Sequence, residues 1–376
     1  MADNPAAPDP VLLTPGPVTT SPTIKAAMLR DRGPRDIEFI EMTRRLRRRL
    51  TTLAGGDGTH VCVPLQGSGT FAVEATIGTL LPPTGKLLVL INGAYGRRMA
   101  TIAGVLGRRV VALQWPEVEP VGTGRLEQAL RADLEITHVA AVHCETTTGM
   151  LNPIEDVARA CARHARPLII DAMSAFGALP LDARETPFAA VVASSNKCLE
   201  GVPGVAFAIV ERAILEQASS NSRSLSLDLF DQWRAFEADG QWRFTPPTHV
   251  VAALDRALDE HAAEGGVAGR GARYRRNLEL LVGGMTRLGF APLLPASLQS
   301  PIIVTFRMPA DPRFVFDQFY GRLRRRGFVV YPGKLTTADS FRIGCIGRID
   351  EEIVGRVLVA VADTMTAMGV RSGEPA

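Results

Sequence analysis

From residue 12 to about residue 250, short apolar runs alternate with longer amphipathic segments, and this alternation leaves few folds open to the chain. Apolar runs of this length are typical of strands that are buried on both faces of a sheet. Strands that alternate with helices predict right-handed βαβ units and a largely parallel sheet. The apolar runs are residues 61–65, 87–91, 110–113, 139–143, 168–170, 189–193 and 205–210, and the helix-like stretches are 69–81, 96–106, 125–131 and 154–164.

The pattern changes after residues 246–247, which are two prolines. Residues 249–288 have the spacing of two helices around a glycine-rich break, and the remainder mixes strands with helices. A chain of 376 residues corresponds to one large or two moderate domains. We predict a mobile N-terminal tail over 1–11, a large mostly parallel α/β domain over 12–250, and a smaller C-terminal α+β domain over 251–376. The expected C-terminal strands are 302–306, 328–331 and 341–345, and the expected helices are 313–326 and 351–368.

Composition and charge exclude several classes of protein. Lys and Arg exceed Asp and Glu by 42 − 39 = 3, too small a surplus to indicate nucleic-acid binding. No apolar run approaches the roughly 18 residues that span a bilayer, and the first ten residues lack the basic start and apolar stretch of a signal peptide. The five cysteines are scattered without a CxxC pair, so we expect reduced thiols and no zinc site. These features predict a cytoplasmic protein.

Two arginine-rich stretches, 44–49 and 322–326, are open to two interpretations. They could bind a polyanion, or each could be the solvated face of an amphipathic helix. Leu46, Leu50 and Leu323 lie among the arginines at helical spacing, and the small net charge also favours the second interpretation.

Polar residues follow several of the apolar runs, at the end of the strand where open parallel sheets bind ligands. Ser68, Gly69 and Thr70 stand between the run at 61–65 and the body of the helix expected over 69–81. The N–H groups and the dipole of a helix start suit a phosphate. Serine and glycine also cap ordinary helices, so both interpretations stay open for this segment alone. It is not a Walker motif.

Asp171 ends the run at 168–170, and Lys197 lies 197 − 171 = 26 residues later, after the run at 189–193. An aspartate that ends an apolar strand needs a cationic partner, and the protonated ring nitrogen of a cofactor would serve; a helix N-cap is the alternative. A lysine in a turn between two hydrophobic strands can be desolvated, which lowers its pKa and makes it a nucleophile toward an aldehyde. The separation suits a crossover to a neighbouring strand, so both side chains could reach one cleft.

Arg342 stands in an otherwise apolar strand of the predicted small domain. A guanidinium in that position needs an anion, which is either a ligand carboxylate or phosphonate or the partner in a structural salt bridge. Together the four segments supply a phosphate cradle, an acid for a ring nitrogen, an imine-forming lysine and an arginine for the substrate. That combination indicates pyridoxal-phosphate chemistry.

At this point the sequence resembles the class V aminotransferases of the fold-type I pyridoxal-phosphate enzymes. The resemblance covers about residues 12–369. The TPGP segment and the lysine turn fit several branches of the family, whereas NGAYG, HCETTTG and SSNKCLEG favour the branch that acts on 2-aminoethylphosphonate. The matching segments are LLTPGPVTTSP (12–22), LQGSGTFAVEA (65–75), NGAYGRRM (92–99), HCETTTGMLNP (143–153), DAMSAFGALP (171–180), SSNKCLEGVPG (194–204), QWRFTPPTHV (241–250) and FRIGCIGRI (341–349).

The resemblance implies an aspartate-aminotransferase-like fold of type I and pyridoxal 5'-phosphate as the cofactor. Lys197 would form the Schiff base, Asp171 would pair with the pyridine nitrogen, and Arg342 would anchor the acid group of the substrate, with Arg35 as a second contact. The implied reaction moves the amino group of 2-aminoethylphosphonate to pyruvate, giving phosphonoacetaldehyde and L-alanine. The other implied cofactor contacts are Ser68, Gly69 and Thr70 at the phosphate, Tyr95 and Met173 on the two ring faces, Thr146 near the ring hydroxyl, Asn196 beside the lysine, and Thr245 from the second subunit of a homodimer.

Other functions stay open at the level of the sequence. Another class V aminotransferase, of the alanine/serine–glyoxylate or –pyruvate type or acting on a substituted aminophosphonate, would share these motifs. A cysteine desulfurase would need a reactive thiol on a mobile loop, whereas Cys345 lies in the same expected strand as Arg342. A cofactor-binding regulatory module is the non-enzyme alternative, but the sequence has no recognisable DNA-binding segment and no GxGxxG motif with a downstream ribose-binding acid.

Overall fold

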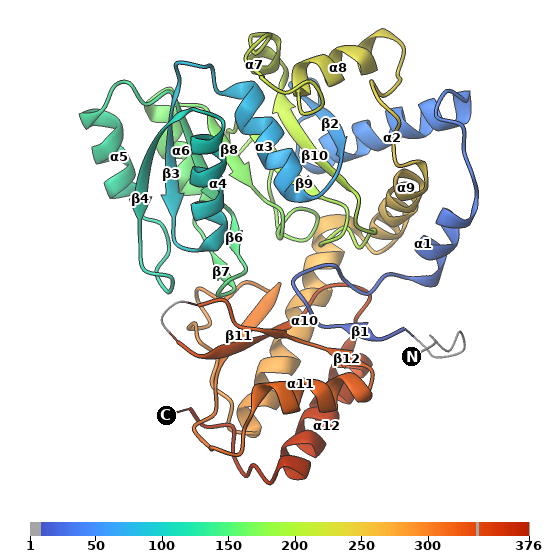
Figure 1. Cartoon of the computed structure of the whole chain (residues 1–376), viewed down its shortest axis with the longest axis vertical. Coiled ribbons are helices and arrows are strands. Elements are labelled where there is room, and N and C mark those ends of the chain that lie inside the picture. The colour runs from blue at the N-terminus through green and yellow to red at the C-terminus, as the bar shows by residue number, and fades with distance from the viewer. Residues whose placement is uncertain (1–8, 336–337, 376) are drawn as a thin grey trace.

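The computed structural model describes residues 9–335 and 338–375, and its largest element is a seven-stranded sheet in the upper part of Figure 1. Six strands run in one direction, and β10 is antiparallel to both of its neighbours, β2 and β9. The predicted fold class is therefore confirmed, and each predicted apolar run overlaps one strand. In spatial order the strands are β2 (His60–Gln66), β10 (Val205–Glu211), β9 (Ala190–Ser194), β8 (Leu168–Asp171), β5 (His138–Val142), β3 (Lys86–Ile91) and β4 (Arg109–Gln114).

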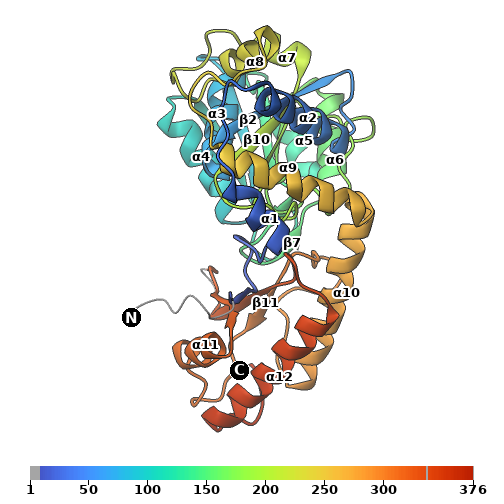
Figure 2. The same ribbon diagram turned by 90° about the vertical axis from the view of Figure 1, so that its right-hand side faces the viewer.

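These strands form continuous apolar runs because helices cover both faces of the sheet (Figures 1 and 2). Val191 and Ala193 of β9 pack into one helical layer, and Ala190 and Val192 pack into the other. The first layer contains α2 (Ile37–Leu53), α5 (Thr123–Ala132), α6 (Ile154–Arg163) and α9 (Thr248–Ala263); the second contains α3 (Gly69–Leu80), α4 (Ala94–Val105), α7 (Arg212–Glu216) and α8 (Leu229–Ala238).

The lower part of Figure 1 has its own core, in which the rings of Phe290, Phe306, Phe319 and Phe341 lie close together. A three-stranded antiparallel sheet in the order β11-β14-β13 forms one side of this core, and helices complete it. The elements are α10 (Gly266–Arg287), β11 (Ile303–Arg307), α11 (Phe316–Arg325), β12 (Phe328–Val329), β13 (Tyr331–Pro332), β14 (Ser340–Gly344) and α12 (Glu351–Met368). A short hairpin of β6 (Cys144–Glu145) and β7 (Met150–Leu151) projects toward it from the large sheet.

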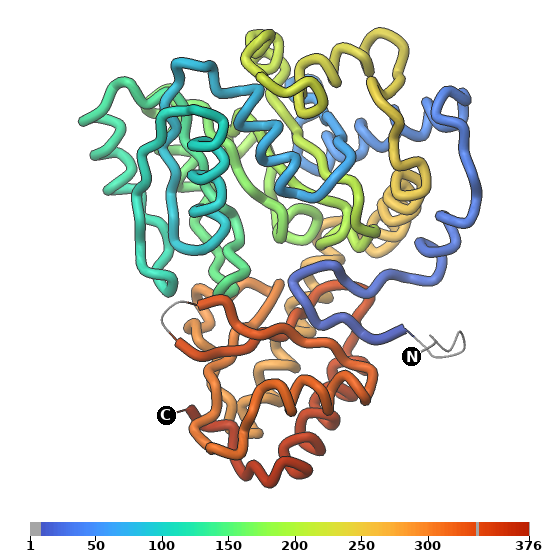
Figure 3. The backbone as a smooth tube through the Cα atoms, in the orientation of Figure 1, coloured from blue at the N-terminus to red at the C-terminus, as the bar shows by residue number. Residues whose placement is uncertain are grey.

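The N-terminal segment joins the two parts of the molecule, as the blue tube in Figure 3 shows. Residues 1–8 of the predicted tail lie outside the described residues. β1 (Val11–Leu12) pairs in parallel with β12 of the C-terminal part. The chain then passes through α1 (Pro22–Ala26) and the 3₁₀ turn η1 (Ala27–Leu29), both of which pack on α9, before it enters α2.

The predicted domain boundary at residue 250 stays a prediction. The helix that follows it, α9, contributes Val251, Leu254 and Leu258 to the core of the large sheet. The next helix, α10, packs on α12 and β11. Gly265 and Gly266 stand at the break between the two helices, as the N-cap and first residue of α10, with φ angles of 97° and 66°, which favour glycine. We therefore propose that the division lies at this glycine pair.

The arginine run at 44–49 forms one face of α2. Leu46 and Leu50 are buried beneath it, as the helical spacing predicts. Arg45 pairs with Asp255 of α9 at 2.5 Å, and Arg47 pairs with Glu237 of α8 at 2.8 Å. The interpretation as a helix face is therefore confirmed for this run.

Candidate active site

One cavity, with a volume of about 180 Å³, lies at the carboxyl ends of β2, β8 and β9. Because parallel strands end at the same edge of a sheet, three segments that are far apart in the sequence meet there. The lining residues are Ser68, Gly69, Thr70, Val73, Tyr95, Arg98, Met99, Val142, Cys144, Asp171, Met173, Ser174, Ser194, Asn196 and Lys197.

The first turn of α3 forms one wall of the cavity. Ser68 is the N-cap residue, yet its side chain makes no capping hydrogen bond, so an ordinary serine cap does not explain the segment. The N–H groups of Gly69 and Thr70 belong to a helix start, where no intrahelical partner exists. A Cβ atom at Gly69 would overlap the end of the Met173 side chain, so the glycine lets that side chain lie against the helix start in this arrangement. The result is a cradle of N–H groups that suits an anion.

Asp171 ends β8 and is 6% exposed. Its Oδ1 accepts a hydrogen bond of 3.0 Å from the Met173 N–H. Burial raises the pKa of the Asp171 carboxyl to about 6, although the nearby charges of Arg98 and Lys197 act in the opposite direction. The next regular element after Asp171 is the strand β9, and no helix begins directly after this aspartate, so the alternative of a helix N-cap fails. The carboxyl is buried where a cationic ligand would stabilise its charged form.

Lys197 lies in the turn between β9 and the antiparallel β10. Burial lowers the pKa of its amine from 10.5 to about 8. The TPGP segment covers this amine, because a Cβ atom at Gly16 would overlap Nζ of Lys197. Gly16 has a φ angle of 122°, which also favours glycine. Sequence reasoning did not select Gly16, although its motif was among the resembling segments.

Arg98 is a second residue that sequence reasoning missed. Its guanidinium lies over the ring of Tyr95, 5.0 Å from the centroid, and its Nη1 is 3.4 Å from Oγ1 of Thr70. It therefore adds a positive charge between the helix start and the aromatic residue expected to stack on a cofactor ring. The signal was available in the NGAYGRRM segment, where only the tyrosine was selected.

Arg342 and Thr146 contact each other outside the lining of the cavity. The guanidinium is 1% exposed, and its Nη1 and Nε donate to the carbonyl oxygens of Thr146 at 3.0 Å and Pro332 at 3.1 Å. Among the described residues no carboxylate pairs with Arg342, which leaves the alternative of a structural salt bridge without support. Oγ1 of Thr146 is buried and has no partner among those residues. This part of the structure therefore contains a buried guanidinium without a carboxylate partner and a buried hydroxyl without a hydrogen bond, both among the described residues.

Arg35 and Thr245 lie away from the cavity in the single chain. They line a separate surface hollow with Trp242 and Phe244. Thr245 and Phe244 also line the neighbouring hollow that contains Gly67, the residue before Ser68. The described chain alone therefore does not bring these two predicted residues into the site.

The described residues show no other chemical centre of the kinds that the sequence raised. No group of three His, Cys, Asp or Glu side chains among them could hold a metal ion, and no helix is long and apolar enough to span a membrane. All five cysteines are buried and free. Burial raises the pKa of the Cys345 thiol to about 12, which is unsuited to a desulfurase nucleophile.

Comparisons with known proteins give consistent results. A family model described as aminotransferase class-V matches residues 24–310. A protein of Burkholderia lata named 2-aminoethylphosphonate–pyruvate transaminase 2 is 55% identical over 362 residues, covering 96% of each chain. A relative with the same activity in its name, from Cupriavidus necator, is 53% identical and covers 98% of this chain and 97% of its own.

The fold also matches solved structures over nearly the whole chain. The pyridoxamine–pyruvate aminotransferase of Mesorhizobium loti superposes with a TM-score of 0.89 at 25% identity, covering 98% of this chain and 95% of its own. The ureidoglycine–glyoxylate aminotransferase of Bacillus subtilis has the same TM-score at 21% identity, covering 97% and 95%.

Proposed function

The chain belongs to the class V aminotransferase family, and on that premise we propose that it transfers the amino group of 2-aminoethylphosphonate to pyruvate, giving phosphonoacetaldehyde and L-alanine. One observation carries the catalytic part: the Lys197 amine, the Asp171 carboxyl and the start of α3 line a single cavity. The names of the relatives that are more than half identical support the choice of donor and acceptor.

Class V aminotransferases use pyridoxal phosphate, and the residues of this chain fit that group. The start of α3, where the Ser68 side chain makes no capping hydrogen bond, suits the phosphate, together with Arg98. Asp171 would hold the ring nitrogen, and Tyr95 and Met173 would lie against the ring. When bound, the group supplies an aldehyde that condenses with amines and a protonated ring that accepts the electrons of the substrate carbon.

The protein side chains perform the remaining steps. Lys197 would hold the cofactor aldehyde, because burial keeps a useful fraction of its amine neutral and therefore nucleophilic. The same amine, when free, would move the proton at the substrate carbon that bears the amino group. Asp171 keeps the ring nitrogen protonated. Gly16 lies over the amine and limits the access of water to it.

The acid group of the substrate needs a cation, and Arg342 is the candidate. A planar guanidinium suits a phosphonate or carboxylate. The same arrangement would serve the alanine/serine–glyoxylate type of enzyme or a substituted aminophosphonate, so the choice of amine depends on the relatives. Arg35 stays a proposal as a second contact to the acid group.

We further propose a cytoplasmic homodimer in which Thr245 of one subunit reaches the phosphate of the other. Phe244 beside it is 49% exposed, and it lines with Phe71 and Leu227 a surface hollow that a second copy would cover. The hollow includes Gly67, next to the phosphate cradle.

The absorbance spectrum of the purified protein with pyridoxal phosphate tests the function directly. Adding 2-aminoethylphosphonate should remove the band of the lysine-bound cofactor and produce that of pyridoxamine phosphate, and pyruvate should reverse the change. A band that ignores this amine but responds to L-serine or L-alanine would overturn the phosphonate assignment. A cofactor band that no amine changes would favour the regulatory module.

Replacing Arg342 by glutamine should raise the KM for 2-aminoethylphosphonate by between about 10-fold and 100-fold, because charge-assisted hydrogen bonds contribute roughly 1.5–3 kcal/mol. The Kd for pyridoxal phosphate should change by less than about threefold, since the phosphate and ring contacts remain. Arg307→Gln is the matched control, because this exposed arginine lies on the adjacent strand β11. An unchanged KM in Arg342→Gln would remove Arg342 from the substrate site.

The rate at which the cofactor-free protein captures pyridoxal phosphate should follow the titration of Lys197. The neutral amine is the nucleophile, so the rate rises with pH. Because burial lowers the pKa of Lys197 to about 8, the rate constant should increase about tenfold from pH 6 to pH 7 and level off above about pH 8. Stopped-flow absorbance measures it. A rate that still rises tenfold per pH unit at pH 9 would show an ordinary exposed lysine.

A further inference from the structure

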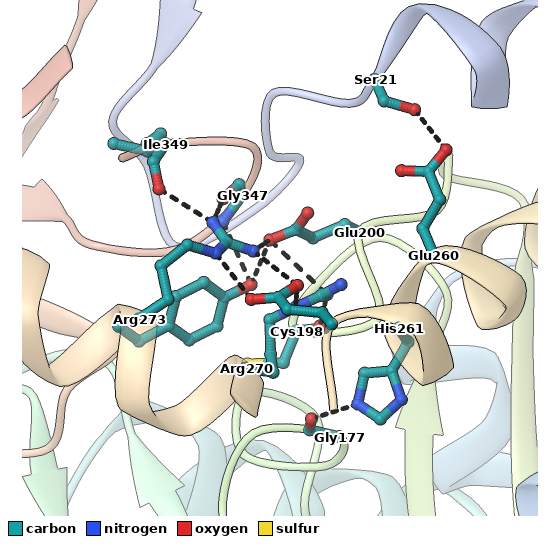
Figure 4. A network of polar contacts seen from close by, with 12 residues as sticks. Ser21, Gly177, Cys198, Glu200, Glu260, His261, Arg270, Arg273, Gly347 and Ile349 are labelled. Atoms are coloured by element: carbon teal, nitrogen blue, oxygen red, sulfur yellow. Dashed lines mark hydrogen bonds and ion pairs between the residues drawn. The ribbon is translucent and has the colours of Figure 1, made fainter. Parts of the chain in front are cut away.

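A largely buried cluster of charged residues, which the catalytic roles do not use, lies beside the turn that contains Cys198 and Glu200 (Figure 4). None of its members lines the cavity. We call it the Glu200 network; it consists of Glu200, Glu264, Arg270, Arg273 and Tyr274. All but Glu200 belong to α10 or to the turn that precedes it. Figure 2 shows α10 running from the large sheet down into the C-terminal part, so the network lies where the two parts of the molecule meet.

On one side the network holds the backbone of the lysine turn. The N–H of Glu200 donates to the carbonyl oxygen of Lys197 at 2.8 Å, and Nη1 of Arg270 donates to the carbonyl oxygen of Cys198 at 2.5 Å. Glu200 has a φ angle of 60°, a region that few residues other than glycine adopt. The surrounding contacts therefore determine the shape of this turn.

The Glu200 side chain points into the network and is 2% exposed. Its Oε1 accepts hydrogen bonds from Nη2 of Arg273 at 2.7 Å and from the Tyr274 hydroxyl at 2.6 Å. Two arginines and two glutamates balance each other's charge. Well-packed apolar residues often stabilise a fold as much as buried ion pairs do. A contribution to stability is therefore a weak explanation for the presence of the Glu200 network.

On the other side the network holds the end of the strand that carries Arg342. Nη1 of Arg273 donates to the carbonyl oxygens of Gly347 at 2.6 Å and Ile349 at 2.8 Å, just beyond β14. One planar guanidinium thus contacts both the Glu200 carboxylate and the loop after the substrate arginine. The Tyr274 hydroxyl makes a second, longer link between the same segments, since it donates to Oε1 of Glu200 and accepts a hydrogen bond of 3.3 Å from the N–H of Gly347. Arg273 makes the shorter contacts to the 347–349 loop, and it is the charged member of the two.

The end of α9 adds a parallel contact to the turn after Asp171. Nε2 of His261 donates to the carbonyl oxygen of Gly177 at 2.6 Å (Figure 4). Residues at the bend between α9 and α10 therefore contact the backbone of both segments: His261 contacts the one that follows Asp171, and Arg270 contacts the one that follows Lys197.

We propose that Arg273 is a positioning residue that fixes the Lys197 turn relative to Arg342, by holding Glu200 on one side and the 347–349 loop on the other. The proposal rests on the proposed function, because it assumes a substrate held by its acid group at Arg342 while its amine reacts at Lys197. Misplacing reacting groups by about 1 Å through a distant substitution can cost roughly 100-fold in rate.

A double-mutant cycle with Arg273→Gln and Arg342→Gln tests the proposal. In the unaltered background, Arg273→Gln should lower kcat/KM for 2-aminoethylphosphonate by about 10-fold to 100-fold. In the Arg342→Gln background, the same change should cost less than about threefold, because no anchored acid group remains to be positioned. Arg276→Gln is the matched control, since this arginine on the same helix makes only an exposed pair with Glu351; it should have no effect in either background.

Two further measurements separate positioning from a general loss of structure. The Kd of pyridoxal phosphate should change by less than about threefold in Arg273→Gln, and Arg273→Lys, which keeps the charge but not the planar fork, should melt closer to the unaltered protein while keeping the kinetic defect. Equal losses in both backgrounds, or full kinetic recovery in Arg273→Lys, would overturn the proposal. If the unaltered enzyme ignores 2-aminoethylphosphonate, the proposed function fails, and the cycle is measured with the amino acid that does convert the cofactor.

Discussion

Replacing Lys197 by alanine is expected to lower kcat by about 10⁴-fold or more and to leave the fold intact. In the proposed mechanism the substitution removes both the nucleophile that holds the cofactor and the base that moves the proton, and a general base alone contributes a factor of roughly 10² to 10⁴ to the rate. The fold should survive because burial already disfavours the charged form of this amine, so its loss removes no stabilising contact of the kind that paired charges make. Steady-state kinetics, the absorbance of the lysine-bound cofactor and thermal unfolding measure the three parts of the prediction.

Lys25→Ala is the matched control, because this lysine of α1 lies near the surface, where it pairs with Asp9. It should retain full activity and the full cofactor band. If Lys197→Ala still showed the band of lysine-bound cofactor, another lysine would have to be the nucleophile, and the catalytic role of the β9–β10 turn would be wrong.

Replacing Asp171 by asparagine should lower kcat by about 10²-fold to 10³-fold, the usual effect of removing one group that stabilises charge in a transition state. Asparagine keeps the size of the side chain and an oxygen for the Met173 N–H, so the turn should keep its shape. It cannot keep the ring nitrogen protonated, so the ring accepts electrons less well. Presteady-state absorbance of the reaction with 2-aminoethylphosphonate isolates this step.

The comparison variant for Asp171 is Asp311→Asn, which removes a carboxylate that pairs with Arg313 on the surface of the C-terminal part. Its kinetics should be unchanged. A normal rate in Asp171→Asn, with the cofactor fully bound, would exclude the carboxylate as the partner of the ring nitrogen.

Most of the large sheet could be predicted because its strands are buried on both faces. Val191 and Val192 face opposite helical layers, yet both need an apolar side chain, so the strand forms an unbroken apolar run. Helices that carry apolar and polar residues on different faces are harder to recognise from the sequence. For example, α8 was not predicted, although its residues Leu229, Trp233 and Phe236 belong to the core. The reversed direction of β10 was not predicted either, since it depends on the short connection between residues 194 and 205 and not on residue type.

The part of the site that comes from strand ends could be predicted, and the rest could not. Asp171, Lys197 and the Ser68–Thr70 segment follow apolar runs, and a parallel sheet must bring such positions to one edge. Arg98 lies on a helix face and Gly16 in a segment without periodicity. No local pattern therefore marks that Arg98 lines the cavity or that Gly16 lies over Lys197. The proposed role of Thr245 depends on a second chain, which a single sequence does not place, and Arg35 lies in the same surface hollow.

The pairing of β1 with β12 has a consequence for how the site is completed during synthesis. The two strands begin 328 − 11 = 317 residues apart, and the carbonyl oxygen of Leu13 accepts a hydrogen bond from the N–H of Gly344. The last strand of the large sheet ends at residue 211, which is 328 − 211 = 117 residues before β12 begins. Since the N-terminal part of a nascent chain folds first, the large sheet can form while the TPGP segment still lacks its anchor. We therefore expect the TPGP segment to reach its final position over Lys197 only after β12 and β14 have been synthesised, so that the amine is accessible to the cofactor until then.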